Sequence, residues 1–296
     1  MKCKLCGSER VNIISTKIRN IDSGKIKVYK CNDCGVHFLY PYYDEIKLEN
    51  YYNGSYRKEY TQEDYYNKNQ IKEFFDKSLP EAKKRLDRIK KYLKKEDKIL
   101  EVGCSSGYFL YTIKDSVNSV YGTEWDEGNA DYCKNNNIQV KKNPEEFNIK
   151  FNKIFMFHVL EHIKDPIHFL KKLKNCLSDE GMLFIEVPNN EDILLSIYDI
   201  PEFRDFYYQS AHIWYFNKRS LGILLNKSGY KFSILGIQRY DISNHIYWLK
   251  NRIPGGNKFF NNIFSQDLNK IYEKNLKEKG KTDTLFAVCY RNEGSL

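Results

Sequence analysis

The sequence predicts an α/β fold, a doubly wound and mostly parallel seven-stranded sheet, with a small ribbon of four cysteines at its N-terminus. Three observations lead to this prediction. Two Cys-x-x-Cys pairs lie near the N-terminus, short apolar segments alternate with helical ones from Lys98 onward, and the stretch "ILEVGCSSGYF" breaks an apolar run with a turn of small residues. With 296 residues, the chain can hold one large domain and a small accessory one.

The two Cys-x-x-Cys pairs predict a structural zinc site in residues 1–40. Each pair, in "CKLCGS" and "CNDCGV", is followed by a glycine that relieves a tight turn, and the segment between them can form a hairpin. Four thiolates close a tetrahedral site. The predicted ligands are Cys3, Cys6, Cys31 and Cys34. His37 is interpreted as a packing residue, and the ribbon could either bind nucleic acid or use zinc only to fold.

Residues 41–96 are predicted to form an aromatic and helical linker or lid. Tyrosines are dense from Tyr40 to Tyr66, and their rings could stack on a sugar or base, or join the ribbon to the next domain. A helix is expected from Pro80 to Lys95, with Ala82, Leu86, Ile89 and Leu93 on one face and a basic, solvated face opposite.

Residues 97–240 are predicted to form the sheet domain, and residues 241–296 a helical insertion and a final strand. Strands are expected in "KILEVGC", "SVYGTEW", "IQVKK", "FNKIFMFHVL" and "GMLFIEVP". Helices are expected in "GYFLYTIKDS", "GNADYCKNNN" and "PIHFLKKLKNCLS". In such a sheet, ligands bind beyond the carboxyl ends of the strands.

The turn after the first of these strands excludes two phosphate-binding motifs. A P-loop needs Lys and Ser or Thr directly after its last glycine, but Tyr108 and Phe109 follow Gly107. The dinucleotide fingerprint needs three glycines, whereas this turn has Gly103, Ser105 and Tyr108 at the required spacing. The turn therefore serves another ligand.

Two acids near the strand ends favour a positively charged ligand. Glu101 precedes the turn, and Glu124 ends the second strand, where a carboxylate suits ribose hydroxyls. The pyrophosphate of NAD would meet Glu101 unfavourably. S-adenosylmethionine has a ribose, no phosphate, and both an ammonium and a sulfonium cation. It is therefore the predicted cofactor.

Together these segments resemble the class I S-adenosylmethionine-dependent methyltransferases, over roughly residues 98–238. The resemblance rests on "LEVGCSSG", on Glu124, on "FHVLEHIKDPIHFLKKLKNCLSDEGMLFIEVPN" and on "HIWYFNKRSLGILLNKSGY". With its ribbon, the chain further resembles the sugar C-methyltransferases of deoxysugar pathways and relatives in cell-envelope glycan clusters. The tail, from "NHIYWLKNRIPGG" onward, is similar to the end of bacterial methyltransferases of such clusters.

The resemblance implies a cofactor site. Four residues would border the methionine part of the cofactor: Glu101, Gly103, Cys104 and Gly107. Glu124 would hold the ribose and Trp125 would lie beside the adenine. Phe157 and His158 would line the cofactor face nearest the acceptor.

Methyl transfer also requires loss of a proton from the acceptor, for which a histidine is the usual base. The candidates are His158, His162, His168 and His212. His212 is favoured, because it lies beyond the last strand of the nucleotide half, and Tyr208, Trp214 and Tyr215 beside it could shape a sugar pocket. His162 could touch the substrate or cap a helix.

The chain departs from the family pattern at three positions. Ser105 replaces the usual middle glycine, and Asn143 stands near an acid that often contacts the adenine amine. Ala211 stands where the resembling sugar C-methyltransferases carry a glutamate directly before the histidine. The missing acid favours oxygen or nitrogen methylation over carbon methylation.

We therefore expect a methyltransferase of a nucleotide-activated sugar or another phosphorylated precursor of a cell-surface glycan, such as a capsule or lipopolysaccharide. The net charge of +9 fits an anionic partner. The alternatives are an RNA methyltransferase that grips RNA with the ribbon and basic helix, and a non-catalytic zinc-dependent binding protein. Nucleic acid is the less favoured partner. The chain has no apolar run of membrane-spanning length and no signal segment, so a cytoplasmic protein is expected.

Overall fold

The computed structural model describes residues 1–19, 25–41 and 68–291. Its contacts divide the chain into two compact units. Unit 1 consists of Met1–Tyr42, Leu160–Ile167 and Ile185–Val288. Unit 2 consists of Tyr43–Val159, His168–Phe184 and Cys289–Leu296. Residues 42–67, which hold most of the predicted aromatic lid, lie outside the described residues.

A seven-stranded sheet has the order β10-β11-β8-β7-β4-β5-β6. The pairs β4–β5, β4–β7 and β5–β6 are parallel. The strands are β4 (Lys98–Val102), β5 (Ser119–Thr123), β6 (Gln139–Lys141), β7 (Phe151–Phe157), β8 (Leu177–Pro188), β10 (Tyr230–Ile237) and β11 (Thr284–Arg291). The predicted doubly wound, mostly parallel sheet is confirmed. Strand β7 is buried at nearly every position, as is typical of a strand covered on both faces.

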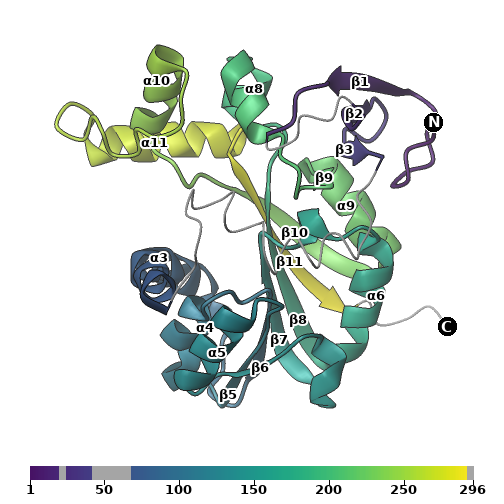
Figure 1. Cartoon of the computed structure of the whole chain (residues 1–296), viewed down its shortest axis with the longest axis vertical. Coiled ribbons are helices and arrows are strands. Elements are labelled where there is room, and N and C mark those ends of the chain that lie inside the picture. Colours follow the sequence, from purple (N-terminus) through teal and green to yellow (C-terminus); the bar gives the residue numbers. More distant parts are fainter. Residues whose placement is uncertain (20–24, 42–67, 292–296) are drawn as a thin grey trace. The chain divides into compact units, whose positions relative to one another are not determined.

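Helices cover both faces of the parallel strands in unit 2. Helices α3 (Lys68–Ile89), α4 (Tyr108–Ile113) and α5 (Glu127–Asn135) lie on one face, and α6 (Pro166–Cys176) lies on the other (Figure 1). Helix α3 packs against α4 and α5. The side chain of Asp126 caps α5 by accepting a hydrogen bond from the backbone N–H of Asn129, which fixes the start of that helix.

The helix predicted at Pro80–Lys95 is wrong in both bounds. Helix α3 begins at Lys68 and ends at Ile89, so Pro80 lies inside it, and a 3-10 turn follows at Lys90–Tyr92. Proline is common at the first position of a helix, so the sequence predicted a helix start at Pro80, which lies inside the helix. The buried side chains of Ile71 and Phe75 continue the apolar face upstream of Pro80 and hold the longer helix.

The basic face of α3 was expected to be solvated, and this is wrong for Arg85. Its side chain is buried, because it lies on the same stripe of the helix as buried Ala82 and Ile89, at the i, i+3, i+7 spacing. The neighbouring Lys83 and Lys84 are exposed, as predicted.

In unit 1, the ribbon forms a four-stranded sheet of order β1-β2-β3-β9. The first three strands are β1 (Val11–Ser15), β2 (Lys27–Cys31) and β3 (His37–Tyr40), and β1 and β2 form the predicted hairpin. The fourth strand, β9 (Trp214–Tyr215), comes from a distant part of the sequence and pairs antiparallel with β3. The ribbon is therefore built into unit 1 by main-chain hydrogen bonds.

The remaining helices of unit 1 follow β8 along the chain. They are α7 (Ile193–Ser196), α8 (Pro201–Tyr207), α9 (Lys218–Lys227), α10 (Ile242–Asn251) and α11 (Gln266–Glu278). Helices α10 and α11 form the insertion between β10 and β11, and Trp248 of α10 packs its ring against Phe203 and Phe206 of α8. No helix in the described ranges is long and apolar enough to cross a bilayer.

Candidate active site and zinc centre

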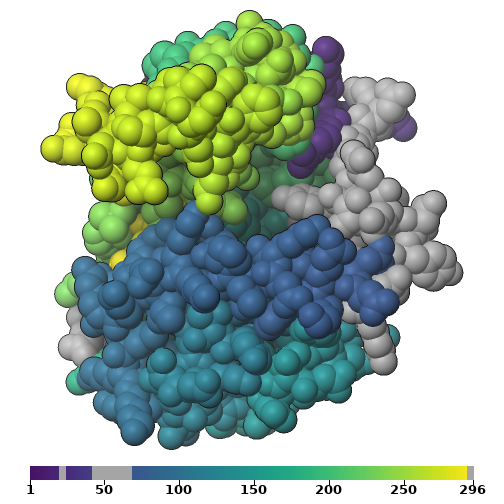
Figure 2. Space-filling model, turned by 90° about the vertical axis from the view of Figure 1, so that its left-hand side faces the viewer, coloured from purple at the N-terminus to yellow at the C-terminus, as the bar shows by residue number. Residues whose placement is uncertain are grey.

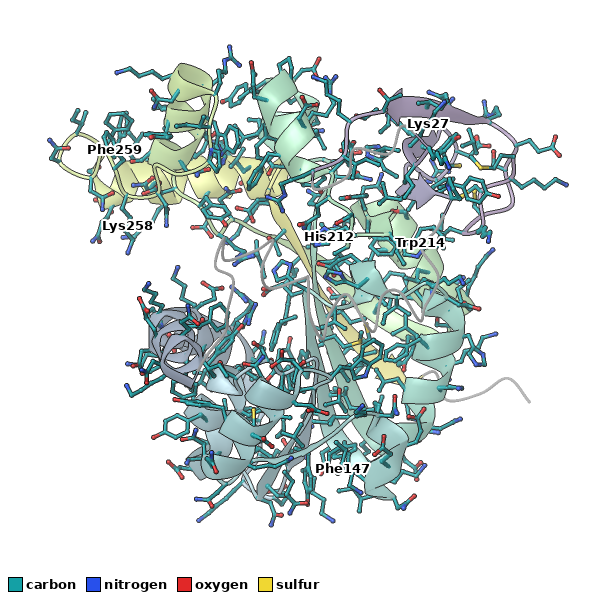
Figure 3. The ribbon with its side chains drawn as sticks, in the orientation of Figure 1. Lys27, Phe147, His212, Trp214, Lys258 and Phe259 are labelled. Atoms are coloured by element: carbon teal, nitrogen blue, oxygen red, sulfur yellow. The ribbon has the colours of Figure 1, made fainter. Side chains whose placement is uncertain are left out.

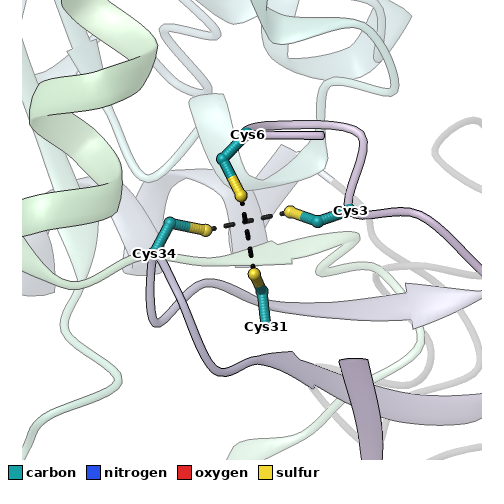
Figure 4. Close-up of side chains that lie close together, drawn as sticks. All are labelled: Cys3, Cys6, Cys31 and Cys34. Carbon is teal, nitrogen blue, oxygen red and sulfur yellow. Dashed lines mark hydrogen bonds between the residues drawn. The ribbon is translucent and has the colours of Figure 1, made fainter. Parts of the chain in front are cut away.

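The four predicted zinc ligands converge at the tip of the ribbon (Figure 4). The Sγ atoms of Cys3 and Cys34 lie 3.8 Å apart, those of Cys6 and Cys31 lie 3.5 Å apart, and all four lie within 4.8 Å of one another. Each Cys-x-x-Cys motif forms a tight turn. The backbone N–H of the glycine that follows the motif donates to the carbonyl of its first cysteine, Gly7 to Cys3 and Gly35 to Cys31. This donor set fits a structural Zn²⁺ ion.

The turn after β4 needs backbone conformations that favour glycine. Gly103, Ser105 and Gly107 have φ angles of 68°, 50° and 76°. A Cβ atom on Gly103 would lie 2.7 Å from the side chain of Val159, and one on Gly107 would lie 2.8 Å from Cys133 Sγ. The side chain of Cys104 is buried with its Sγ 4.0 Å from that of Cys133. Cys104 can therefore border a ligand only through its backbone.

A buried carboxylate lies directly before this turn. Burial raises the pKa of Glu101 well above its usual range, an effect that the Arg85 cation opposes and the Glu124 carboxylate adds to. Its Oε2 atom has no hydrogen-bond partner among the residues that the structure describes. A buried carboxylate oxygen without a partner is costly, so this atom fits a cationic ligand group such as the ammonium of S-adenosylmethionine.

Arg85 is a site residue that the sequence analysis missed. Its Nη1 donates a 3.0 Å hydrogen bond to the hydroxyl of Tyr108, and its guanidinium lies 4.1 Å from the centre of the Phe157 ring. Arg85 and Glu101 thus place a buried cation and a buried carboxyl group in one site. Arg85 could have been identified from its position on the apolar stripe of α3, because an arginine on a buried face is rarely solvated.

The second predicted carboxylate is held at the end of β5. Glu124 accepts 2.8 Å hydrogen bonds from the backbone N–H groups of Ser105 and Asp126, which join it to the turn after β4. Trp125 next to it is exposed and donates from Nε1 to the carbonyl of Lys142. Asn143, by contrast, caps a 3-10 turn through Glu146.

At the end of β7, Phe157 is buried and His158 adopts a left-handed backbone conformation with φ 56°. This conformation is strained for a residue other than glycine, and such strain clusters at functional sites.

A second cluster, in unit 1, brings together Glu161, His162 and His212. The backbone N–H of Ile213 donates to Glu161 O at 2.9 Å, His162 Nδ1 is 2.8 Å from Ala211 O, and Trp214 Nε1 donates to Ile163 O at 3.0 Å. These three hydrogen bonds fix residues 161–163 against residues 211–214. Figure 3 labels His212 and Trp214 on this second segment. The two histidine rings lie edge to face, 4.7 Å between centres.

The hydrogen bonds place the proton on Nδ1 in both histidines, but they use the Nε2 lone pair of His212. A carbonyl oxygen can only accept, so Nδ1 of His162 carries the proton and Nε2 carries the lone pair in the neutral ring. For His212, the amide nitrogen of Gln209 lies 2.6 Å from Nε2, and Arg19 donates to the amide oxygen of Gln209. Gln209 therefore donates to His212 Nε2. The Gln209 donor thus occupies the lone pair with which His212, the base favoured by the sequence, would accept a proton.

The buried carboxylate of Glu161 lies 3.9 Å from His212 Nε2. An acid near His212 was thought to be missing because Ala211 precedes it, but the acid comes from the other segment. The ligand atoms of Glu161, His162 and His212 lie within 4.8 Å of one another, a spacing that also suits a divalent cation. Such an ion would need the His212 lone pair to which Gln209 donates, so the arrangement fits proton transfer better.

Tyr208 was predicted to be catalytic, and the structure places it between this segment and the ribbon. Its hydroxyl lies 2.9 Å from Nδ1 of His37, and both side chains are buried. Burial lowers the pKa of His37 to about 3 and raises that of Tyr208. A neutral histidine and a neutral phenol in contact favour a packing role for Tyr208, as was expected for His37.

Comparison with known families identifies the larger part of the chain. Residues 73–233 match the family described as methyltransferase domain. The chain belongs to the S-adenosylmethionine-dependent methyltransferases. Residues 1–39 match the zinc-ribbon family described as transcription factor S-II (TFIIS), so the methyltransferase carries an N-terminal four-cysteine zinc ribbon of this type.

Two similar proteins extend this comparison. A crystal structure of an S-adenosylmethionine-dependent methyltransferase from Archaeoglobus fulgidus superposes with a TM-score of 0.52 at 17% identity, over 75% of this chain and 98% of the other. At this identity the match shows the fold alone. A tRNA U34 carboxymethyltransferase from Campylobacter fetus is 30% identical over 129 residues. This alignment covers 38% of the present chain and 45% of that relative, so the chain spans less than half of the relative's length.

The zinc site leads to a first prediction. Replacing Cys31 with Ser leaves three thiolates, so the variant should lose the metal, and its melting temperature should fall by about 10 °C because the ribbon strands lose their anchor. Elemental analysis should find one zinc per wild-type chain and none in the variant. Cys176→Ser, at a cysteine outside the ribbon, should keep the metal. A stable, metal-free wild-type protein would contradict the assignment, as would a second zinc lost on His212→Ala.

Proposed function

We propose that this methyltransferase transfers the methyl group of S-adenosylmethionine to an oxygen or nitrogen of a nucleotide-activated sugar or another phosphorylated precursor of a cell-surface glycan. The observation that carries the proposal is the pairing of β9 with ribbon strand β3. The segment that holds His212 leads directly into β9, so the ribbon supports the wall of the histidine cluster. A ribbon used in this way fits a small acceptor better than a long RNA.

The surroundings of the histidines support an aromatic and cationic acceptor pocket. The hydroxyl of Tyr215 accepts a hydrogen bond from the backbone N–H of Gln209, which holds the Tyr215 ring beside His212. Arg19 lies over the ring of Phe206 and donates to Gln209. Tyr215 is buried, so it supports Gln209 and His212 from within the fold. The partly exposed Phe206 ring suits the apolar face of a sugar, and the fixed Arg19 suits a phosphate group.

The hydrogen bond of His162 bears on the acidity of the acceptor. Its Nδ1–H donates to the neutral carbonyl of Ala211 rather than to a carboxylate, so this base lacks the strong activation that a carbon acid needs. A hydroxyl or amine loses its proton more readily. This supports oxygen or nitrogen as the methylated atom.

On the cofactor side, we propose that four side chains recognise the ends of the ligand. S-adenosylmethionine supplies the electrophilic methyl group when bound. Glu101 would accept hydrogen bonds from its ammonium and Arg85 would bind its carboxylate, because a buried cation beside a buried carboxyl group matches an amino-acid zwitterion. Glu124 would bind the ribose hydroxyls, and Trp125 would lie beside the adenine.

This zwitterion recognition predicts a selective loss of affinity. Arg85→Met should weaken binding of S-adenosylhomocysteine by about 10- to 100-fold, because it removes a charged hydrogen bond worth about 1.5–3 kcal/mol. Binding of 5′-methylthioadenosine, which lacks the amino-acid part, should stay unchanged. Calorimetry with both ligands measures this, with Lys83→Met on the same helix as the control. Equal losses for the two ligands would mean general damage to the site instead.

The raised pKa of Glu101 gives the same site a pH dependence. Without ligand, burial favours the protonated carboxyl, whereas an ammonium group requires the carboxylate. Affinity for S-adenosylhomocysteine should therefore increase as the pH rises through the raised pKa, with release of a proton on binding. Glu101→Gln should bind weakly at every pH and remove this dependence.

For proton removal, we propose His162 as the group that takes the acceptor proton, with His212 holding it in place. His162→Ala should lower the single-turnover rate of methyl transfer by about 10²- to 10⁴-fold, the usual contribution of a positioned acid–base group. His212→Ala should have the smaller effect, and both should keep wild-type cofactor affinity. A larger loss in the His212 variant would reverse the assignment of the base.

The acceptor class can be tested directly. The methyltransferase, incubated with labelled S-adenosylmethionine, should transfer label to members of a panel of nucleotide-sugars and sugar phosphates, and not to total RNA. His162→Ala serves as the catalytically impaired control. Label in RNA alone would overturn the sugar proposal.

The second candidate function is an RNA methyltransferase. It is favoured by the partial similarity to a tRNA U34 carboxymethyltransferase and by the relation of the ribbon to transcription factor S-II. The RNA arm of the same experiment distinguishes it from the first.

A further inference from the structure

The last turn of α10 and the segment that joins it to α11 expose large apolar side chains together with cations. Residues 249–264 contain Lys250, Arg252 and Lys258, and neither Asp nor Glu. The exposed fractions of Phe259 and Ile263 are 64% and 68%, and Leu249 and Ile253 are also exposed. Figure 2 shows α10, this segment and α11 on the surface in yellow-green, and Figure 3 labels Lys258 and Phe259 within the segment. We call residues 249–264 the cationic apolar loop.

The loop has a defined conformation. The backbone N–H of Lys258 donates to Asp241 at 2.9 Å, and that of Phe260 donates to Ser243 Oγ at 3.2 Å. Asn244 donates from its side chain to the carbonyl of Gly255 at 2.6 Å. The chain thus folds back onto the first turn of α10, and its apolar side chains project outward from a fixed backbone.

Gly256 shows how closely the loop approaches this helix. Its φ is 76°, and a Cβ atom there would lie 2.2 Å from Cβ of Tyr247. Only glycine permits this return. The exposure of Phe259 and Ile263 is therefore set by the fold of the loop.

The cations of the loop differ from those of the next helix. On α11, Lys270 pairs with Asp267 at 3.1 Å and Lys277 pairs with Glu273 at 2.6 Å. Within residues 68–291, no ion pair joins Lys250, Arg252 or Lys258 to a carboxylate, so their charges can act on an external anion. Apolar character continues onto α11 through exposed Leu268 and Ile271.

We propose that the cationic apolar loop binds to an anionic lipid surface, with Phe259 and Ile263 inserted among the lipids and the cations beside the headgroups. Aromatic and aliphatic side chains flanked by lysine and arginine are the pattern of peripheral membrane attachment. A second copy of the chain, docked loop against loop, would bring like charges together, because residues 249–264 carry no acid. The proposal needs neither cofactor nor acceptor and is independent of the proposed function.

Vesicle sedimentation of the full-length protein tests the proposal. The wild type should sediment with phosphatidylcholine vesicles that contain about 30 mol% phosphatidylglycerol, and much less with phosphatidylcholine alone or at about 0.5 M NaCl. The double variant Phe259→Ser/Ile263→Ser should bind at least about tenfold more weakly. Lys258→Glu should lower binding by more than about fivefold, because it replaces a cation with an anion.

Matched controls separate the loop from the general surface. Ile197→Ser removes an equally exposed isoleucine of unit 1, and Lys231→Glu changes an exposed lysine there, and both should sediment as the wild type does. Affinity for S-adenosylhomocysteine should be unchanged in all variants. Absence of vesicle binding, or equal binding by the loop variants, would overturn the proposal. So would a wild-type dimer, detected by light scattering, that the double variant abolishes while vesicle binding is absent.

Discussion

The histidine cluster that we propose for the acceptor depends on main-chain hydrogen bonds between three segments that are far apart in the sequence. Strand β3 of the ribbon pairs with β9, and the residues before β9 bond to residues 161–163 through Ile213 and His162. A ribbon of about 40 residues has too little core to fold alone, so the free energy of zinc binding stabilises it. The metal therefore stabilises a wall of the histidine cluster, although none of its ligands belongs to that cluster.

The site that we propose for the cofactor depends on buried charge instead. Glu101 lies where burial opposes ionisation, and Arg85 lies in a site lined by Phe157 and Tyr108. Replacement of a buried pair of charged groups by well-packed apolar residues is often neutral or stabilising, so a structure that keeps both groups accepts a cost in the ligand-free state. A ligand that brings the opposite charges would offset this cost, and in our proposal it would tie the stability of unit 2 to an occupied cofactor site.

The sequence predicted the parts of the fold that local chemistry determines. The cysteine spacing identified the ribbon, and the alternation of apolar segments identified the sheet. The failures came where tertiary contacts decide. Pro80 is a start signal only if nothing upstream packs, but Ile71 and Phe75 do pack. Arg85 looked like one of many surface cations, since its burial depends on the partners that α3 meets. The proton positions of His162 and His212 depend on Ala211 O and Gln209, and no sequence pattern encodes these contacts.

The contrast between local sequence signals and tertiary contacts also explains why the sequence did not predict an acid near His212. A comparison with a family pattern matches residues position by position. At position 211 the chain has alanine where the resembling sugar C-methyltransferases have glutamate. In space, however, the carboxylate near His212 belongs to Glu161, which is placed there because its own carbonyl accepts the Ile213 hydrogen bond. The Ala211 carbonyl meanwhile fixes the ring of His162. A carboxylate that comes from Glu161 rather than from position 211 changes the distance and the geometry of its pair with His212. The difference from the sugar C-methyltransferase pattern therefore concerns how strongly the base is activated rather than whether an acid is present.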